Sequence, residues 1–240
     1  MIPIRRSIPA QDTYVDENLR LTKYCDLRGC NCKVPQELLH KLFDSSHCTH
    51  PQYTRSAEDH LSLPNFVPLN PGAAETSVTP LKHGGLSMVQ AADFSYPLID
   101  DAYTMGRIGC ANVLSKIYAM GIIDCDNMLM LLTLSTKLDE KDREKVASAI
   151  LSGFRDCAAE VGTAVTGGQT VLNPWLSIGG VATSVCLPNE FVLPNSALPG
   201  DVLVLTKPLG SQVAVSIYQW LTSGLDKWKQ LKTVGFYNGY

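Results

Sequence analysis

The chain has 240 residues, of which 45% are hydrophobic and 18% charged, and its formal net charge at pH 7 is -3. This is the composition of a soluble globular protein with one large domain or two small ones. The lack of a basic surplus argues against direct binding to DNA or RNA. The N-terminus shows no apolar segment of a secretory signal, and the apolar run 128–132 is far too short to span a bilayer. We therefore expect a cytoplasmic protein with mostly reduced cysteines and no membrane or nucleic-acid partner.

Residues 1–74 are predicted to form a flexible N-terminal arm that carries a reactive segment. Residues 1–20 are polar and broken by prolines, without a helical or strand period. Further on, Cys30, Cys32 and Lys33 place two thiols beside an ammonium group, ahead of a short amphipathic helix expected at about 36–43. A neighbouring cation lowers the pKa of a thiol and increases its reactive thiolate form. The alternative interpretation is a pair of small buried residues.

The stretch 44–74 is predicted to be a solvated loop. It is rich in Ser, His, Pro, Asn and Gly and has little periodicity. His47, Cys48 and His50, with His60 beyond them, have the residue types of a zinc site. A structural zinc ion needs four well-spaced ligands, and this spacing does not provide them.

Residues 75–190 are predicted to form the main domain, built of alternating strands and helices. Strands are expected over four β-type or apolar stretches: 77–81, 86–94, 128–134 and 176–186. Helices are expected over two amphipathic stretches, from the cap at Asp100 and Asp101 to Gly121 and from about 139 to 162. The continuous apolar character of 128–134 indicates a strand buried on both faces. Asp93 closes the second strand, where functional groups are common.

Two further features of this domain concern glycine and cysteine. Gly167 and Gly168 lie in the segment 166–170, where a glycine pair lets backbone N–H groups approach phosphate oxygens. Because no Walker-type motif accompanies them, a plain turn is the better interpretation from these residues alone. Cys110, Cys157 and Cys186 fall within apolar segments and are predicted to belong to the core.

Residues 191–240 are predicted to begin a further domain. Prolines at 188, 194 and 199 mark a junction, followed by an expected strand at 201–205 and helix at 211–221. A single strand and a single helix cannot bury both faces of a domain, so we expect this domain to be incomplete.

Seven stretches, taken in order and spacing, resemble selenophosphate synthetase (selenide, water dikinase) in its animal-type form. They are LTKY at 21–24, GCNCKVP at 29–35, PLKHGGLS at 80–87, MGRI at 105–108, YAMG at 118–121, TGGQTVLNPW at 166–175 and LTKPLG at 205–210. The resemblance implies an α/β (α+β) fold of the aminoimidazole ribonucleotide synthetase type, with a mixed sheet and flanking helices. It also implies ATP-dependent conversion of selenide to selenophosphate for selenocysteine, with release of AMP and phosphate. Mg²⁺ and often K⁺ are then required, and the protein is dimeric through its N-terminal domains.

The resemblance also implies roles for individual residues, position by position. Cys30 matches the site of the selenium-handling cysteine or selenocysteine, and Lys33 matches the phosphate-binding lysine, so both are candidate catalytic residues. The matches to ATP contacts are Asp93, Gly167, Gly168, Gln169 and Thr170. Asp93 and Glu75 are the candidate Mg²⁺ ligands, although Glu75 stands where the family has aspartate.

Two departures from the family leave two hypotheses open. Lys116 stands where the family has a metal-binding aspartate, which replaces attraction for a divalent ion by repulsion, although its ammonium group could contact a phosphate of ATP instead. The chain also ends before the family's Asp-x-Thr-Gly-Phe-Gly motif, which we expect of a C-terminally truncated product. The chain is then either a selenophosphate-forming enzyme or a catalytically impaired isoform or paralogue that dimerises with and regulates a full-length synthetase.

Overall fold

The computed structural model describes residues 19–29, 33–35, 37–38, 76–82, 84–193, 197–205, 208–223 and 226. The chain divides into two compact units, Met1–Ser196 and Ala197–Tyr240, which are described separately below. None of the helices within the described residues is long and apolar enough to cross a membrane.

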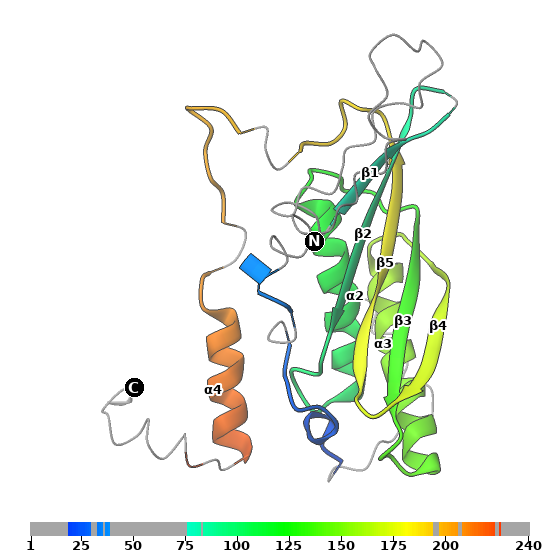
Figure 1. Cartoon of the computed structure of the whole chain (residues 1–240), viewed down its shortest axis with the longest axis vertical. Helices are drawn as coiled ribbons and strands as arrows, with labels where there is room; N and C mark the ends of the chain where they lie inside the picture. The colour runs from blue at the N-terminus through cyan, green and yellow to red at the C-terminus, as the bar shows by residue number, and fades with distance from the viewer. Residues whose placement is uncertain are drawn as a thin grey trace. The chain divides into compact units, whose positions relative to one another are not determined.

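The first unit is built on a mixed sheet of five strands (Figure 1). The strands are β1 (Thr76–Pro80), β2 (Ser87–Ser95), β3 (Asn127–Ser135), β4 (Val165–Asn173) and β5 (Ser177–Cys186). They lie in the order β1-β2-β5-β3-β4, and only the β3–β4 pair is parallel. The predicted strands at 77–81 and 86–94, which pair with each other, and the predicted strand at 176–186 are confirmed, each within a residue or two of the expected bounds.

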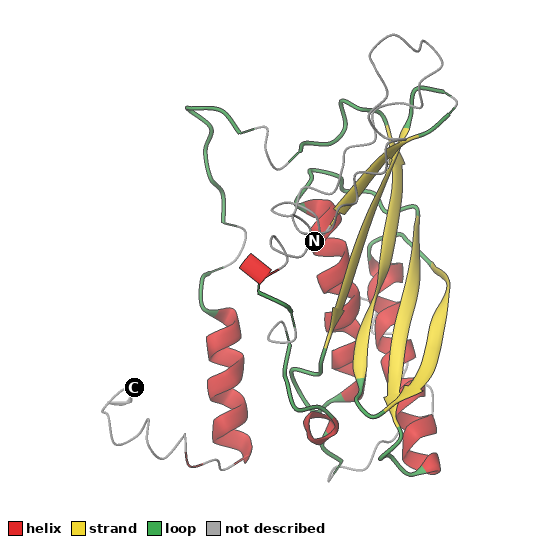
Figure 2. Cartoon of the chain, viewed as in Figure 1, coloured by secondary structure: helices red, strands yellow, loops and turns green. Residues whose placement is uncertain are grey.

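Two helices, α2 (Ala102–Tyr118) and α3 (Glu140–Glu160), cover one face of this sheet (Figure 2). As predicted, α2 begins at an aspartate cap, where the side chain of Asp101 accepts a hydrogen bond from the backbone N–H of Thr104. The helices approach closely because Gly153 has no side chain. A Cβ atom there would lie 1.9 Å from the carbonyl oxygen of Tyr103. The core forms between the helices and the sheet around side chains such as Phe154, and Cys110, Cys157 and Cys186 are buried as predicted.

The opposite face of the sheet is only partly covered by the described residues: Thr133 on this face is buried beside Trp175, whose carbonyl oxygen accepts a hydrogen bond from it at 2.9 Å. Burial alternates over the first part of β3, where Met128 and Met130 are buried while Leu129 and Leu131 are only half-buried, and residues 132–135 are all buried. The prediction of a strand buried on both faces therefore holds for residues 132–135 and is wrong for Leu129 and Leu131, because both helices lie on the same side. Part of an apolar sheet face remains accessible.

Part of the predicted flexible arm is docked on the first unit. The 3₁₀ helix η1 (Leu21–Tyr24) inserts the fully buried side chain of Leu21 into the core. The expectation of a flexible arm therefore does not hold for residues 19–29. Of the predicted helix at 36–43, only residues 37–38 are described, and both are helical; the loop with His47, Cys48, His50 and His60 lies outside the described residues.

In the second unit, α4 (Ser211–Ser223) confirms the predicted helix. The predicted strand at 201–205 is wrong, since these residues adopt no regular structure and Leu203 is 96% exposed. An apolar run becomes a strand only where a neighbouring strand pairs with its backbone, and the described residues provide none here.

Candidate functional site

The structure brings together two of the predicted site residues, Lys33 and Asp93. The Nζ atom of Lys33 lies 3.2 Å from Oδ1 of Asp93, whose side chain is only 5% exposed. The same carboxylate oxygen accepts a hydrogen bond from the backbone N–H of Phe94 at 3.0 Å. The ion pair joins the N-terminal arm to β2, the strand that carries the predicted site residue Asp93.

The alternation of β2 explains why this carboxylate is buried. Val89, Ala91 and Asp93 point to the face that the helices cover, while Phe94 points to the other face. Burying an ionised carboxylate in such a position is costly unless a cation or hydrogen-bond donors compensate it. Lys33 supplies the cation, so the site combines one buried negative charge with one accessible positive charge.

The glycine-rich segment 166–170 lies within β4, at the far edge of the sheet from β2. The prediction of a turn is wrong, because pairing with β3 extends this segment. Gly168 adopts a φ of 140°, and a Cβ atom there would lie 1.8 Å from the carbonyl oxygen of Met130. This position therefore needs glycine for strand packing, whether or not a phosphate binds beside it.

The β4 segment is level with Asp93 but not adjacent to it. Register places Asp93, Gly180, Met130 and Gly168 in one row across the sheet. Three strand spacings separate the ends of this row, which is roughly 14 Å. Gly167, Gly168, Gln169 and Thr170 are all exposed, so the described chain presents two separate polar places along one row.

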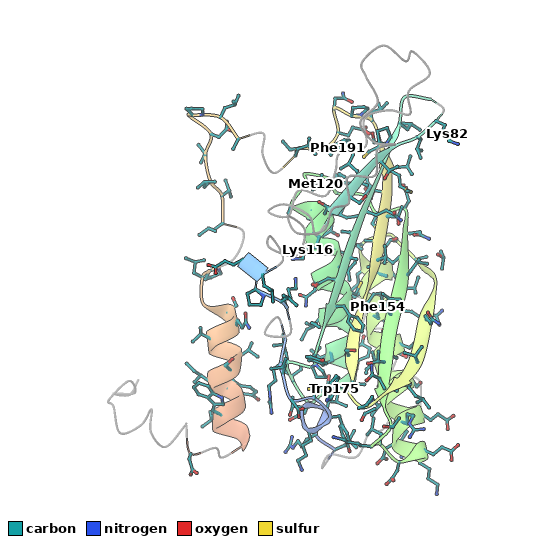
Figure 3. The ribbon with its side chains drawn as sticks, viewed as in Figure 1. Lys82, Lys116, Met120, Phe154, Trp175 and Phe191 are labelled. Carbon is teal, nitrogen blue, oxygen red and sulfur yellow. The ribbon has the colours of Figure 1, made fainter. Side chains whose placement is uncertain are left out.

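Lys116 lies in the last turn of α2 and is half-buried (Figure 3). A cation is favourable at this end of a helix because the unsatisfied carbonyl groups carry partial negative charge. An aspartate at the same place would be disfavoured by the helix dipole, by about 0.3 to 1 kcal/mol. The lysine is therefore compatible with a stable helix in the absence of metal.

The described residues do not form a metal centre by themselves. Within them, no group of three or more His, Cys, Asp or Glu side chains is arranged to hold a metal ion. Cys30, Cys32 and Glu75 lie outside the described residues. Asp93 is the only predicted Mg²⁺ ligand that the structure describes, and it contacts Lys33.

Sequence reasoning assigned Asp100 only to a helix cap and missed its contacts with the arm. Its Oδ1 accepts hydrogen bonds from the backbone N–H of Thr22 at 3.0 Å and from the Thr22 hydroxyl at 2.7 Å. The one available signal was the doubled aspartate, since a helix needs a single cap and Asp101 provides it. Nothing in the sequence pointed from Asp100 to Thr22.

Comparison with known proteins first defines the class of the domain. Residues 75–186 match the family described as AIR synthase related protein, N-terminal domain. The mixed sheet with flanking helices is the fold that the resemblance implied, and this expectation is confirmed.

Closer relatives then define the family. The chain is 52% identical to selenide, water dikinase 3 of Danio rerio over 92% of its length, and 53% identical to selenide, water dikinase 2 of Homo sapiens over 90%. It covers 51% of each of these two proteins. A probable selenide, water dikinase of Caenorhabditis elegans is 46% identical over 90% of this chain, which covers 54% of that protein. The chain belongs to the selenide, water dikinase family and spans about half the length of the relatives it matches.

Solved structures give more distant similarities. A protein of Thermus thermophilus aligns with 52% of this chain and 40% of its own, at 19% identity and a TM-score of 0.42. Thiamine monophosphate kinase of Aquifex aeolicus aligns with 50% of this chain and 39% of its own, at 14% identity and a TM-score of 0.40.

Proposed function

We propose that this chain takes part in the ATP-dependent conversion of selenide to selenophosphate, with release of AMP and phosphate, and so supplies selenium for selenocysteine. The names of its relatives support the reaction class. The observation that carries the proposal is the 3.2 Å contact between Lys33 and the buried Asp93. It unites the lysine to which the resemblance gives a phosphate role with the aspartate to which it gives an ATP role.

In this proposal Lys33 exchanges one anionic partner for another. Its side chain is 34% exposed, so the ammonium group can turn from Asp93 to the phosphate oxygens of ATP. Cys30, three residues earlier in the chain, would handle selenide. The freed carboxylate of Asp93, with Glu75, would provide oxygen ligands for Mg²⁺, which stabilises charge on the transferring phosphoryl groups when bound; K⁺ is a further expected requirement.

The β4 segment has a second role in the proposal. Gly167, Gly168, Gln169 and Thr170 would contact ATP through backbone N–H groups on the outer side of an edge strand. Lys116 would contact a phosphate oxygen, since it cannot serve as a metal ligand.

The test of the proposal follows AMP formation from ATP by the purified chain, with Mg²⁺ and with or without selenide. We expect selenide-dependent AMP, reduced at least about a hundredfold by Lys33→Met because a charge-stabilising group is lost. Lys141→Met is the matched control, since Lys141 lies exposed in the first turn of α3. Equal rates in the two variants would contradict the role of Lys33.

Lys116 favours a second candidate, a catalytically impaired chain that regulates a full-length synthetase. At about 4 Å and an effective dielectric constant of about 20, each unit-charge pair contributes about 4 kcal/mol, and lysine in place of aspartate reverses its sign. Lys116→Asp is then expected to raise the affinity for Mg²⁺-ATP at least about tenfold in titration calorimetry. Unchanged affinity would refute the charge argument, and selenide-dependent AMP from the unaltered chain would refute the impaired candidate.

Either candidate would act as a dimer, and the partly uncovered face of the sheet supports this. On that face, Leu129 of β3 lies beside Val181 of β5, and the next row holds Leu131 of β3 and Phe94 of β2; together these side chains form an accessible apolar patch. A second copy, or a full-length relative, would remove this surface from water. Leu131→Asp is expected to give monomers in sedimentation, whereas Leu151→Asp on the exposed side of α3 is not. A dimer that survives Leu131→Asp would exclude this face.

A further inference from the structure

The arm is fixed to the first unit at several points between residues 19 and 29. Leu21 is fully buried, and the carbonyl oxygen of Tyr24 accepts a hydrogen bond from the backbone N–H of Leu176 at 3.0 Å. At the end of the segment, Gly29 donates to the carbonyl oxygen of Tyr96 at 3.1 Å and forms an isolated bridge with it. Tyr96 directly follows β2, so the arm reaches the end of the strand that carries Asp93.

Asp100 is the charged anchor of this segment. The first N–H groups of a helix have no partner within the helix, and the flanking Arg20 gives η1 no side-chain cap. Asp100 caps it from a distant part of the chain, through Thr22, with hydrogen bonds of 3.0 and 2.7 Å. Its second oxygen lies 3.7 Å from a guanidinium nitrogen of Arg20. Hydrogen bonds to a charged acceptor are the stronger kind.

The neighbouring residues Asp100 and Asp101 therefore have separate structural roles. Asp101 caps its own helix through Thr104, while Asp100 caps a helix that precedes it in the chain by 78 residues. Both carboxylates are fixed to the start of α2, so the arm and the helix share one rigid support.

We propose that Asp100 is a positioning residue: by capping η1 it holds residues 19–29 on the first unit and thereby sets Lys33 on Asp93. Only residues 30–32 lie between the anchored segment and Lys33, so release of the segment also releases the lysine. The catalytic consequence rests on the proposed function, whereas the docking of the arm does not.

The test compares Asp100→Ala with Asp101→Ala in the full chain. The first readout is acylation of Lys33 by an amine-reactive ester under native conditions, measured by mass spectrometry relative to the exposed Lys141. The second is the rate of tryptic cleavage after Lys23, inside η1. Asp100→Ala should raise both rates about tenfold, the factor expected for loss of hydrogen bonds to a charged group. Asp101→Ala should lower the melting temperature without changing either rate.

Two further variants separate positioning from general damage. Asp100→Asn keeps an oxygen that accepts from Thr22 and should restore most of the protection, while Thr22→Val removes one of the two hydrogen bonds and should give an intermediate rate. Unchanged rates in Asp100→Ala, or an equal rise in Asp101→Ala, would overturn the inference. If Asp100→Ala exposes Lys33 but leaves selenide-dependent AMP formation intact, the positioning stands and the proposed role of Lys33 fails.

Discussion

The ion pair between Lys33 and Asp93 yields a quantitative prediction. At 3.2 Å and an effective dielectric constant of about 20, the two charges attract by about 5 kcal/mol before desolvation. Because the lysine side chain is 34% exposed, water screens the pair and most of this energy is offset. We expect a net coupling energy of about 1 to 2 kcal/mol.

The two single variants should differ in their effects on stability. Lys33→Met leaves the carboxylate of Asp93 buried without this cation, at a cost of about 2 kcal/mol. Asp93→Asn keeps an acceptor for the backbone N–H of Phe94 and leaves an ammonium group that can reach water, so its cost should be about 1 kcal/mol.

The assay is urea unfolding of the unaltered chain, both single variants and the double variant at pH 7. The double-mutant cycle isolates the coupling energy because it subtracts the effects that each change has alone. A coupling energy near zero, or a larger loss from Asp93→Asn than from Lys33→Met, would refute the reasoning from burial.

Three further predictions concern packing and pH. Gly153→Ala should cost about 3 kcal/mol or more in thermal unfolding, because its Cβ would lie 1.9 Å from the carbonyl oxygen of Tyr103 and the helices would have to separate. The hydrogen bonds from Arg107 lower the pKa of Glu160, so the stability they provide is present above the usual carboxyl pKa and lost as pH falls through the lowered value. Glu160→Gln should therefore cost about 0.5 kcal/mol at neutral pH, since the pair is exposed, and progressively less in acid. Burial raises the pKa of Cys25 from 9.0 to about 11, so the folded state favours the neutral thiol. The contribution of this thiol to the free energy of unfolding is fully present below pH 9.0 and is lost as pH rises towards 11. The melting temperature should then fall more steeply over this interval than in Cys25→Ser.

Each of these predictions has a clear contrary result. Gly162→Ala is the control for Gly153→Ala, because a Cβ atom at Gly162 would meet nothing within 4 Å. Only the backbone φ of 78° disfavours alanine at Gly162, at a cost in stability of about 1 kcal/mol. Equal losses in the two variants would exclude the steric explanation. A loss of stability in Glu160→Gln that grows in acid would contradict the sign assigned to Glu160. Melting temperatures of Cys25→Ser that fall in parallel with those of the unaltered chain above pH 9.0 would contradict the raised pKa of Cys25.

The sequence by itself determined the local elements of the main domain. The apolar stripe of α3, the cap at Asp101 and the two strands of the β1–β2 hairpin follow from patterns within about twenty residues, and short-range preferences are enough to set them. The ordered motifs also identified the family and its candidate site residues, Lys33 and Asp93 among them.

Only the tertiary structure decided how these elements meet. Strand pairing turned the glycine-rich segment into β4, and the lack of a partner left residues 201–205 without regular structure. Because both helices lie on one side of the sheet, Leu129 and Leu131 of β3 remain partly accessible. The contacts of Asp93 with Lys33 and of Asp100 with Thr22 join residues far apart in the chain. Local preferences do not predict such contacts, because they depend on how the whole core packs.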